Sequence, residues 1–91
     1  MRVQWTDRAE NDRENAIEYI AQDSLTAALN QLDEIEGQTD RLAEYPKLGR
    51  PGRVKGTREL VVNRTSFIAV YRIKGEFVQI LRLLHGAKKW L

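Results

Sequence analysis

The side chain best suited to acid–base chemistry in this sequence is a single histidine near the C-terminus. His85 follows a strongly apolar run and precedes Gly86, a residue type that lets the backbone turn sharply. Because imidazole titrates near neutral pH, His85 is the natural candidate to donate or accept a proton in a reaction. The plainer interpretation is a histidine at the end of a strand with its ring bonded to the backbone.

Basic side chains accompany this histidine along the sequence. Arg82 interrupts the apolar run, and because an unpaired buried guanidinium is costly, we expect it to pair with an acid or to reach a functional site. A site that cleaves a phosphodiester would draw on Arg58, Arg82, His85 and Lys88. A surface that binds an anion or an acidic protein would draw on Arg50, Arg53, Arg58, Arg64, Arg72, Arg82, His85, Lys88, Lys89 and Trp90. Each of these could also be an ordinary solvated side chain, and Trp90 could cap the core.

The charge distribution supports a basic surface in the second half of the chain. Residues 46–91 hold 11 of the 15 Lys and Arg residues but only 2 of the 13 acids, a net charge of +9. Residues 1–45 hold the other 4 bases and 11 acids, a net charge of −7. Such asymmetry is an argument about partners, and it predicts that the second half meets nucleic acid or an acidic protein segment.

Composition excludes several classes of site. The chain has no cysteine and one histidine, so a disulfide, a thiolate zinc site, a cysteine nucleophile and a multi-histidine metal site are all excluded within it. We therefore expect no metal and no cofactor. The sequence MRVQWTD at the N-terminus lacks the apolar run of a signal peptide, and no long apolar segment follows. We expect one domain over residues 1–91, in the cytoplasm and away from membranes.

The hydrophobic pattern predicts an α+β fold. Val3 and Trp5 alternate with polar residues before Thr6 and Asp7, which are good helix caps. Asp23 and Ser24 then separate two runs of helical periodicity, and Pro46 opens a loop rich in glycine and proline. The expected elements are a strand at 3–5, helices over 7–22 and 25–43, a loop over 47–56, and strands over 57–63, 67–73 and 77–85. Short turns between the last three strands imply an antiparallel meander, on which the helical hairpin packs.

Four motifs stand out in the second half: Leu48–Arg53, Gly56–Leu60, Val70–Arg72 and Val78–Gly86. Together they resemble the RelE/ParE toxin superfamily of bacterial type II toxin–antitoxin systems. The resemblance implies the same strand–helix–helix–strand–strand–strand order, growth inhibition and roles such as plasmid stabilisation. It also implies a cognate antitoxin whose flexible segment wraps the toxin, which makes the functional assembly a hetero-oligomer.

Two activities are known in this superfamily. RelE-like members are endoribonucleases that cut messenger RNA on the ribosome, whereas ParE-like members bind and poison DNA gyrase without a nuclease site. Nuclease members resemble Tyr-Arg-Leu-Val-Tyr in the middle strand, where this chain reads Phe67-Ile68-Ala69-Val70-Tyr71. Ile68 cannot donate a hydrogen bond to phosphate, and the strand Glu59–Val62 lacks the closely spaced lysines of the RelE type.

These departures favour a gyrase inhibitor of the ParE-like branch, with no catalytic residue of its own. The alternative is a RelE-like endoribonuclease that acts on ribosome-bound mRNA. A third reading is a basic RNA- or protein-binding module without toxicity.

Overall fold

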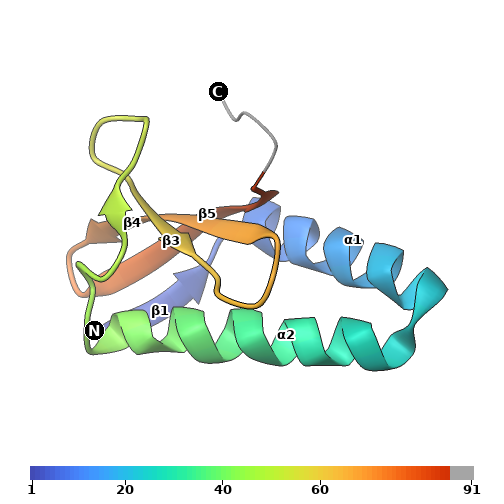
Figure 1. Ribbon diagram of the computed structural model, residues 1–91. Helices are drawn as coiled ribbons and strands as arrows, with labels where there is room; N and C mark the ends of the chain where they lie inside the picture. The colour runs from blue at the N-terminus through green and yellow to red at the C-terminus, as the bar shows by residue number, and fades with distance from the viewer. Residues whose placement is uncertain (87–91) are drawn as a thin grey trace.

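In the computed structural model, which describes residues 1–86, two helices pack on one face of a five-stranded sheet (Figure 1). The elements are β1 (Arg2–Trp5), α1 (Asp7–Asp23), α2 (Leu25–Asp40), the 3₁₀ helix η1 (Arg41–Ala43), β2 (Arg50–Pro51), β3 (Arg58–Val61), β4 (Phe67–Lys74) and β5 (Phe77–His85). The strand order is β1-β5-β4-β3-β2, with β1 parallel to β5 and the other neighbours antiparallel. The predicted α+β class, helical hairpin and antiparallel meander are confirmed.

Two hydroxyl side chains fix where the helices begin. The Oγ1 of Thr6 accepts a hydrogen bond from the backbone N–H of Ala9 (3.2 Å), and the Oγ of Ser24 accepts one from Ala27 (3.1 Å). Each satisfies an amide that the first helical turn leaves without a partner. Ser24 also donates its backbone N–H to Ile20 and so closes α1. One serine therefore ends one helix and begins the next, which keeps the hairpin connection short.

The structure differs from the sequence prediction at three places. Strand β3 spans Arg58–Val61 and is shorter than the predicted 57–63, because Val62 already bonds across the turn to Phe67. The second helix ends at Asp40 and continues as η1, because the backbone tightens to 3₁₀ geometry ahead of Tyr45 and Pro46. Leu42 of η1 is still buried in the core, so the spacing of apolar residues gave no sign that the α-helix becomes a 3₁₀ helix. The predicted loop contains the short strand β2, whose two residues pair with Glu59 and Arg58 of β3. Two residues are too few for a periodic signal.

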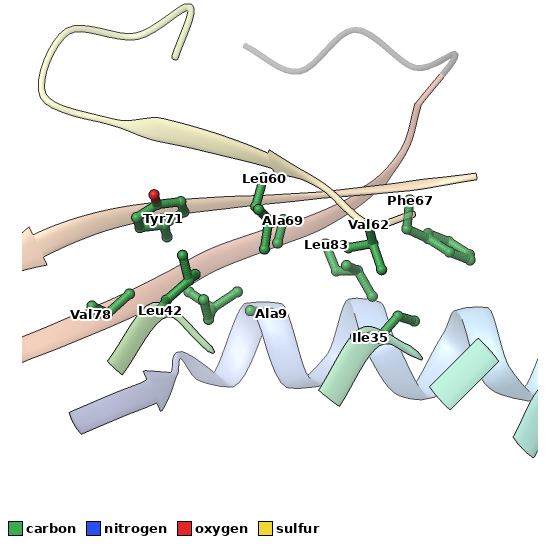
Figure 2. Packing of buried hydrophobic residues seen from close by; sticks show 11 residues of the cluster. Ala9, Ile35, Leu42, Leu60, Val62, Phe67, Ala69, Tyr71, Val78 and Leu83 are labelled. Atoms are coloured by element: carbon green, nitrogen blue, oxygen red, sulfur yellow. The ribbon is translucent and has the colours of Figure 1, made fainter. Parts of the chain in front are cut away.

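The core lies between the helices and the sheet (Figure 2). Ala9, Ile35 and Leu42 come from the helical layer and are fully buried. They meet alternate residues of the strands, which are Leu60, Val62, Phe67, Ala69, Tyr71, Val78, Ile80 and Leu83. The residues between them, such as Ile68 and Arg72, therefore point to the opposite, outer face of the sheet. Tyr71 is fully buried.

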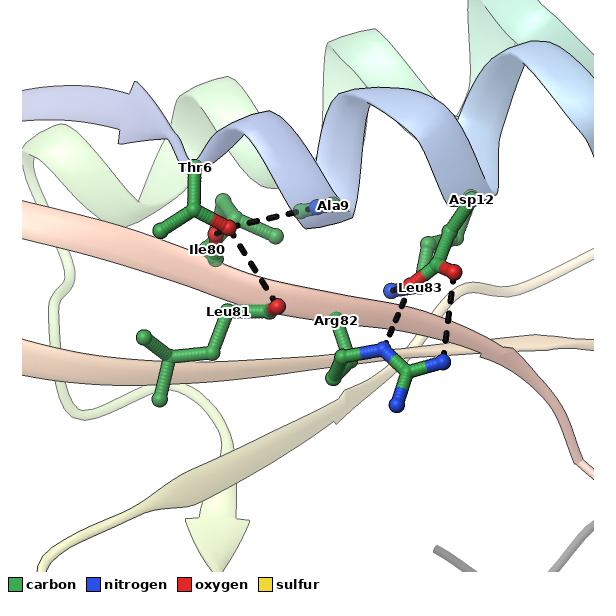
Figure 3. A network of polar contacts seen from close by, with 7 residues as sticks. All are labelled: Thr6, Ala9, Asp12, Ile80, Leu81, Arg82 and Leu83. Atoms are coloured by element: carbon green, nitrogen blue, oxygen red, sulfur yellow. Dashed lines mark hydrogen bonds and ion pairs between the residues drawn. The ribbon is translucent and has the colours of Figure 1, made fainter.

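A β-bulge separates two parts of β5. Tyr71 pairs with Ile80 and Val70 with Arg82, so Leu81 is the extra residue. The Oγ1 of Thr6 lies 3.1 Å from the carbonyl oxygen of Ile80 and 3.3 Å from that of Leu81, and it donates to this bulge (Figure 3). Thr6 thus joins the start of α1 to the β-bulge of β5. The bulge directly precedes Arg82, so this contact helps to fix the position of Arg82 relative to α1.

No helix among residues 1–86 is long and apolar enough to cross a membrane. Within the same range, no three His, Cys, Asp or Glu side chains gather closely enough to hold a metal ion.

Candidate binding surface

Arg82 is held by an acid from α1. Its Nε and Nη2 donate to the two carboxylate oxygens of Asp12, at 2.7 and 3.2 Å (Figure 3). This fork-to-fork geometry is the strong form of an Arg–carboxylate contact. Hydrogen bonding to Asp12 raises the pKa of Arg82, against the opposing effect of burial. Of the two outcomes expected for Arg82, the structure shows the pairing with an acid.

Asp12 also closes the edge of β5. Strand β1 covers β5 only from Phe77 to Ile80, so the edge beyond Ile80 has no neighbouring strand. There the Oδ2 of Asp12 accepts the backbone N–H of Leu83 at 3.0 Å. The side chain thus does for Leu83 what a neighbouring strand would do. Nothing in the sequence singles out Asp12 for this role, because residues 1–45 hold eleven acids that could equally have paired with Arg82.

An open hollow of about 620 Å³ lies beside this ion pair. Its lining residues are Asp12, Asn15, Ala16, Tyr19, Ile20, Gln31, Ser66, Phe67, Arg82, Leu83, Leu84 and His85. His85 is exposed there, and its ring meets Phe67 edge-on with 5.9 Å between ring centroids. The hollow therefore brings His85 and Arg82 to one place, although the guanidinium is already engaged by Asp12.

A second group of arginines surrounds a buried carboxylate on β3. The Glu59 side chain is only 2% exposed, and its Oε1 lies 3.2 Å from Nη2 of Arg50. Its Oε2 accepts the backbone N–H of Arg53 at 3.1 Å, and the Nε of Arg53 lies 3.8 Å away. A carboxylate this deeply buried needs such partners. Glu59 therefore fixes the segment of β2, which the sequence presented only as a basic loop.

Arg58 is positioned by a buried tyrosine. The Tyr71 hydroxyl donates to the carbonyl of Pro46 (2.7 Å) and accepts the N–H of Gly49 (2.9 Å). Gly49 in turn accepts a hydrogen bond from Nη1 of Arg58 at 2.7 Å. Burial raises the pKa of Tyr71, so the phenol stays protonated. A side chain at position 49 would collide with Tyr71 and with the backbone of Glu59, which explains the glycine.

The other predicted residues lie elsewhere. Arg64 sits in the β3–β4 turn, and its Nη1 contacts Glu34 of α2 at 3.0 Å. Arg72 lies on the outer face of the sheet and donates from Nε to Gln79 (2.9 Å), which donates to Gln4 (3.2 Å). Lys88, Lys89 and Trp90 lie outside the described residues. The described basic candidates thus form two separate groups, Arg50, Arg53 and Arg58 around β2 and Arg82 with His85 beside the hollow, while Arg64 and Arg72 lie apart.

An aliphatic strip crosses the outer face of the sheet between these groups. Val61 pairs with Ile68 and Ile68 with Leu84, so the three side chains lie in a row over β3, β4 and β5. Val61 is exposed, Ile68 partly buried and Leu84 buried. Ile68, the residue that departs from the nuclease pattern, lies in the middle. The strip can bind an apolar partner surface but offers no donor to a phosphate.

Comparison with known proteins identifies a family for the whole chain. Residues 3–90 match the family described as ParE toxin of type II toxin-antitoxin system, parDE. Y4kP of Sinorhizobium fredii, which is named as a toxin, is 42% identical over 89 residues, covering 98% of this chain and 92% of its own. Toxin RelE2 of Caulobacter vibrioides is 38% identical over 86 residues, covering 94% and 96%.

A solved structure shares the fold. It is described as the chromosomal ParDE TA system from P. aeruginosa, and it matches with a TM-score of 0.83 and 32% identity, over 93% of this chain and 95% of that chain.

Proposed function

This chain belongs to the ParE toxin family of type II toxin–antitoxin systems, and from that premise we propose that it arrests growth by binding and poisoning DNA gyrase. It is the toxin component of a ParDE-type system. In this proposal the toxin acts by contact with the enzyme, with no catalytic residue of its own. Because gyrase works on the chromosome, the proposal places the chain in the cytoplasm.

The observation that carries the proposal is the aliphatic strip of Val61, Ile68 and Leu84. A nuclease needs a cation where negative charge develops on the phosphorane. Here the strip occupies the sheet face at Ile68, and Arg82, which pairs with Val70 in the next row, is engaged by Asp12. An apolar row that is exposed at Val61 and partly exposed at Ile68, with Arg50 paired to the neighbouring Glu59, instead has the composition of a protein-binding surface.

Purified gyrase tests the proposal directly. The chain should block supercoiling and accumulate cleaved DNA, and it should leave ribosome-bound mRNA intact. The double variant Val61→Ser, Ile68→Ser should lose at least tenfold in inhibition, because apolar contacts at an interface centre carry much of its energy. Supercoiling that is unaffected by a tenfold excess of folded wild-type chain would refute the proposal.

Ile73→Ser is the matched control for that variant. Ile73 lies on the same strand, β4, and is 37% exposed, but it points to the other face of the sheet from Ile68. Its replacement removes similar apolar area far from the strip, so inhibition should stay within about twofold of wild type. An equal loss in both variants would mean that the effect is one of folding rather than of contact.

A RelE-like endoribonuclease is the second candidate, favoured by the hollow that joins His85 to Arg82 and by the likeness to a relative named RelE2. In that case His85 would transfer the proton and Arg58, Arg82 or Lys88 would face the phosphate. Cleavage of ribosome-bound mRNA that His85→Ala abolishes, with supercoiling unaffected, would select this candidate over the first.

We also propose that a cognate antitoxin binds this chain and neutralises it. The family and the likeness to a ParDE complex support this partner, and the uneven charge fits an acidic segment on the basic half. Expression of the chain alone should arrest growth, and co-expression of the neighbouring reading frame should restore it. Normal growth with confirmed soluble expression would favour a non-toxic RNA- or protein-binding module instead.

A further inference from the structure

The edge of β3 that faces β2 is only partly occupied. Val62 donates its backbone N–H to the carbonyl oxygen of Phe67 (3.0 Å). In an antiparallel ladder, the N–H and C=O groups of every second residue point to the same neighbouring strand. Leu60 and Arg58 therefore also bond to β4. Glu59, Val61 and Asn63 therefore direct their N–H and C=O groups away from β4. These three residues are the positions at which a further strand could pair with this edge of the sheet, and each such position is called a rung below.

Two of the three rungs are filled. Glu59 pairs with Arg50 of β2. At Asn63 the side chain of Gln38 takes the place of a strand, because its Oε1 accepts the Asn63 N–H (2.7 Å) and its Nε2 donates to the Asn63 carbonyl (2.9 Å). In Figure 1 the β3–β4 connection (orange) reaches down to α2, the helix that carries Gln38.

The rung between them is open. Val61 would face Leu48 if β2 continued, but the chain turns away there, because Leu48 bonds to Tyr45 and Gly49 bonds to Tyr71. Among residues 1–86, the outward N–H and C=O of Val61 have no protein partner. A hollow of about 300 Å³ lies at this point, and Gln38, Leu48, Arg50, Val61 and Asn63 are among the residues that line it.

The walls of this hollow define the chemistry of an occupant. Leu48 and Val61 are each 46% exposed and present apolar surface. Arg41 supplies positive charge, and the one acid in the lining, Glu59, is already paired with Arg50 and Arg53. An extended segment can pair its backbone with Val61, and since its side chains alternate, it can place one apolar residue beside Val61 and an acidic one towards Arg41.

We propose that the open rung at Val61 is a strand-addition site for an extended, acidic and apolar segment of the antitoxin. This inference rests on the proposed toxin–antitoxin function and adds where and how one segment of the partner binds. The added strand takes the line of β2 between Arg50 and Gln38, and the N–H and C=O of Val61 give it its register. Charge complementarity with Arg41 selects an acidic segment.

Replacement by proline tests the backbone contact. Val61→Pro removes only an N–H that points away from β4, which an edge strand tolerates, and the preceding residue is already extended. Val61→Ala is the matched control, since it shortens the side chain but keeps the N–H. Affinity for the purified antitoxin from the neighbouring reading frame should be about tenfold weaker for proline than for alanine, the effect of about one backbone hydrogen bond.

Hydrogen exchange on the wild-type complex gives a second readout that needs no variant. The Val61 amide should exchange fast in the free chain and be protected at least tenfold more in the complex. Arg41→Gln should weaken binding about threefold at low salt, with the difference shrinking at high salt. Equal affinities of the proline and alanine variants, or an unprotected Val61 amide in a tight complex, would overturn strand addition and leave the toxin–antitoxin function standing. A wild-type chain that does not bind the antitoxin at all would overturn both.

Discussion

The two edges of the sheet are closed in different ways, and the comparison separates stability from recognition. On the β5 side, Asp12 takes the N–H of Leu83 and the guanidinium of Arg82 together, and both side chains are largely shielded from water. On the β3 side, the partly buried Gln38 closes one rung at Asn63 through hydrogen bonds that are exposed to water, and the rung at Val61 stays open. A partly buried ionic closure makes a fixed edge, whereas a neutral closure with exposed hydrogen bonds leaves an edge that a partner can extend.

Removal of Asp12 tests the fixed edge and should have the largest effect. Asp12→Ala leaves the Arg82 charge and the Leu83 N–H without partners, which should lower the free energy of unfolding by about 2–3 kcal/mol. The cost is below that of a fully buried pair because 21% of the Arg82 side chain is exposed. Urea unfolding measures it, with Glu18→Ala, exposed on the same helix, as the control. Equal stability of the two variants would show that the ion pair does not hold this edge.

Tyr71 tests how the β2 side is anchored. Tyr71→Phe leaves the N–H of Gly49 and the carbonyl of Pro46 unpaired, so we expect a loss of about 1–2 kcal/mol. Since burial raises the pKa of Tyr71 above its ordinary value of 10.0, the folded state keeps the proton longer than the unfolded state. Its contribution is fully present below that ordinary value and is lost as pH rises through the raised pKa.

Stability measured above about pH 10 should therefore fall more steeply for wild type than for Tyr71→Phe. Parallel pH profiles of the two proteins would contradict the role given to the buried hydroxyl.

Gln38 tests the exposed closure and should have a smaller effect. Gln38→Ala removes two hydrogen bonds to Asn63, but water can replace them, so we expect a loss of about 0.5–1 kcal/mol. The Asn63 amide should exchange faster in the variant, and amides of β5 should not change. A loss as large as that of Asp12→Ala would remove the contrast between the two edges.

The ion pair of Arg64 and Glu34 should have the smallest effect. The hydrogen bond from Arg64 lowers the pKa of Glu34, with a further contribution from Gln38. Because the folded-state pKa is depressed, any stabilisation is present above the ordinary value of 4.5 and disappears as pH falls through the folded-state pKa. The Arg64 side chain is 79% exposed, so Glu34→Gln should be hardly distinguishable from wild type at pH 7. A clear shift of the urea unfolding midpoint of Glu34→Gln at pH 7, relative to wild type, would contradict this prediction.

Much of the fold could be predicted from the sequence, because the signals concerned are local. Thr6 and Ser24 cap the helices by bonding to amides three residues away, and the apolar periods include the buried Ala9, Ile35 and Leu60. Leu25 and Leu29 share the period of α2 but are exposed, because the helix extends beyond the sheet that would cover them. The argument from Ile68 also needs no tertiary structure, because an isoleucine side chain cannot donate a hydrogen bond to a phosphate in any fold. The test against gyrase therefore follows from residue types together with the family.

The closures of the sheet edges were decided by tertiary structure alone. Arg82 needed an acid, but only the packing of α1 against β5 chose Asp12, a residue 70 positions away. Gln38 and Asn63, 25 residues apart, met because α2 runs beneath the β3–β4 turn. The open rung at Val61 depends on where β2 leaves the sheet, which Tyr71 fixes from the core. Partners this distant are set by how the layers pack, and no sequence period records that choice.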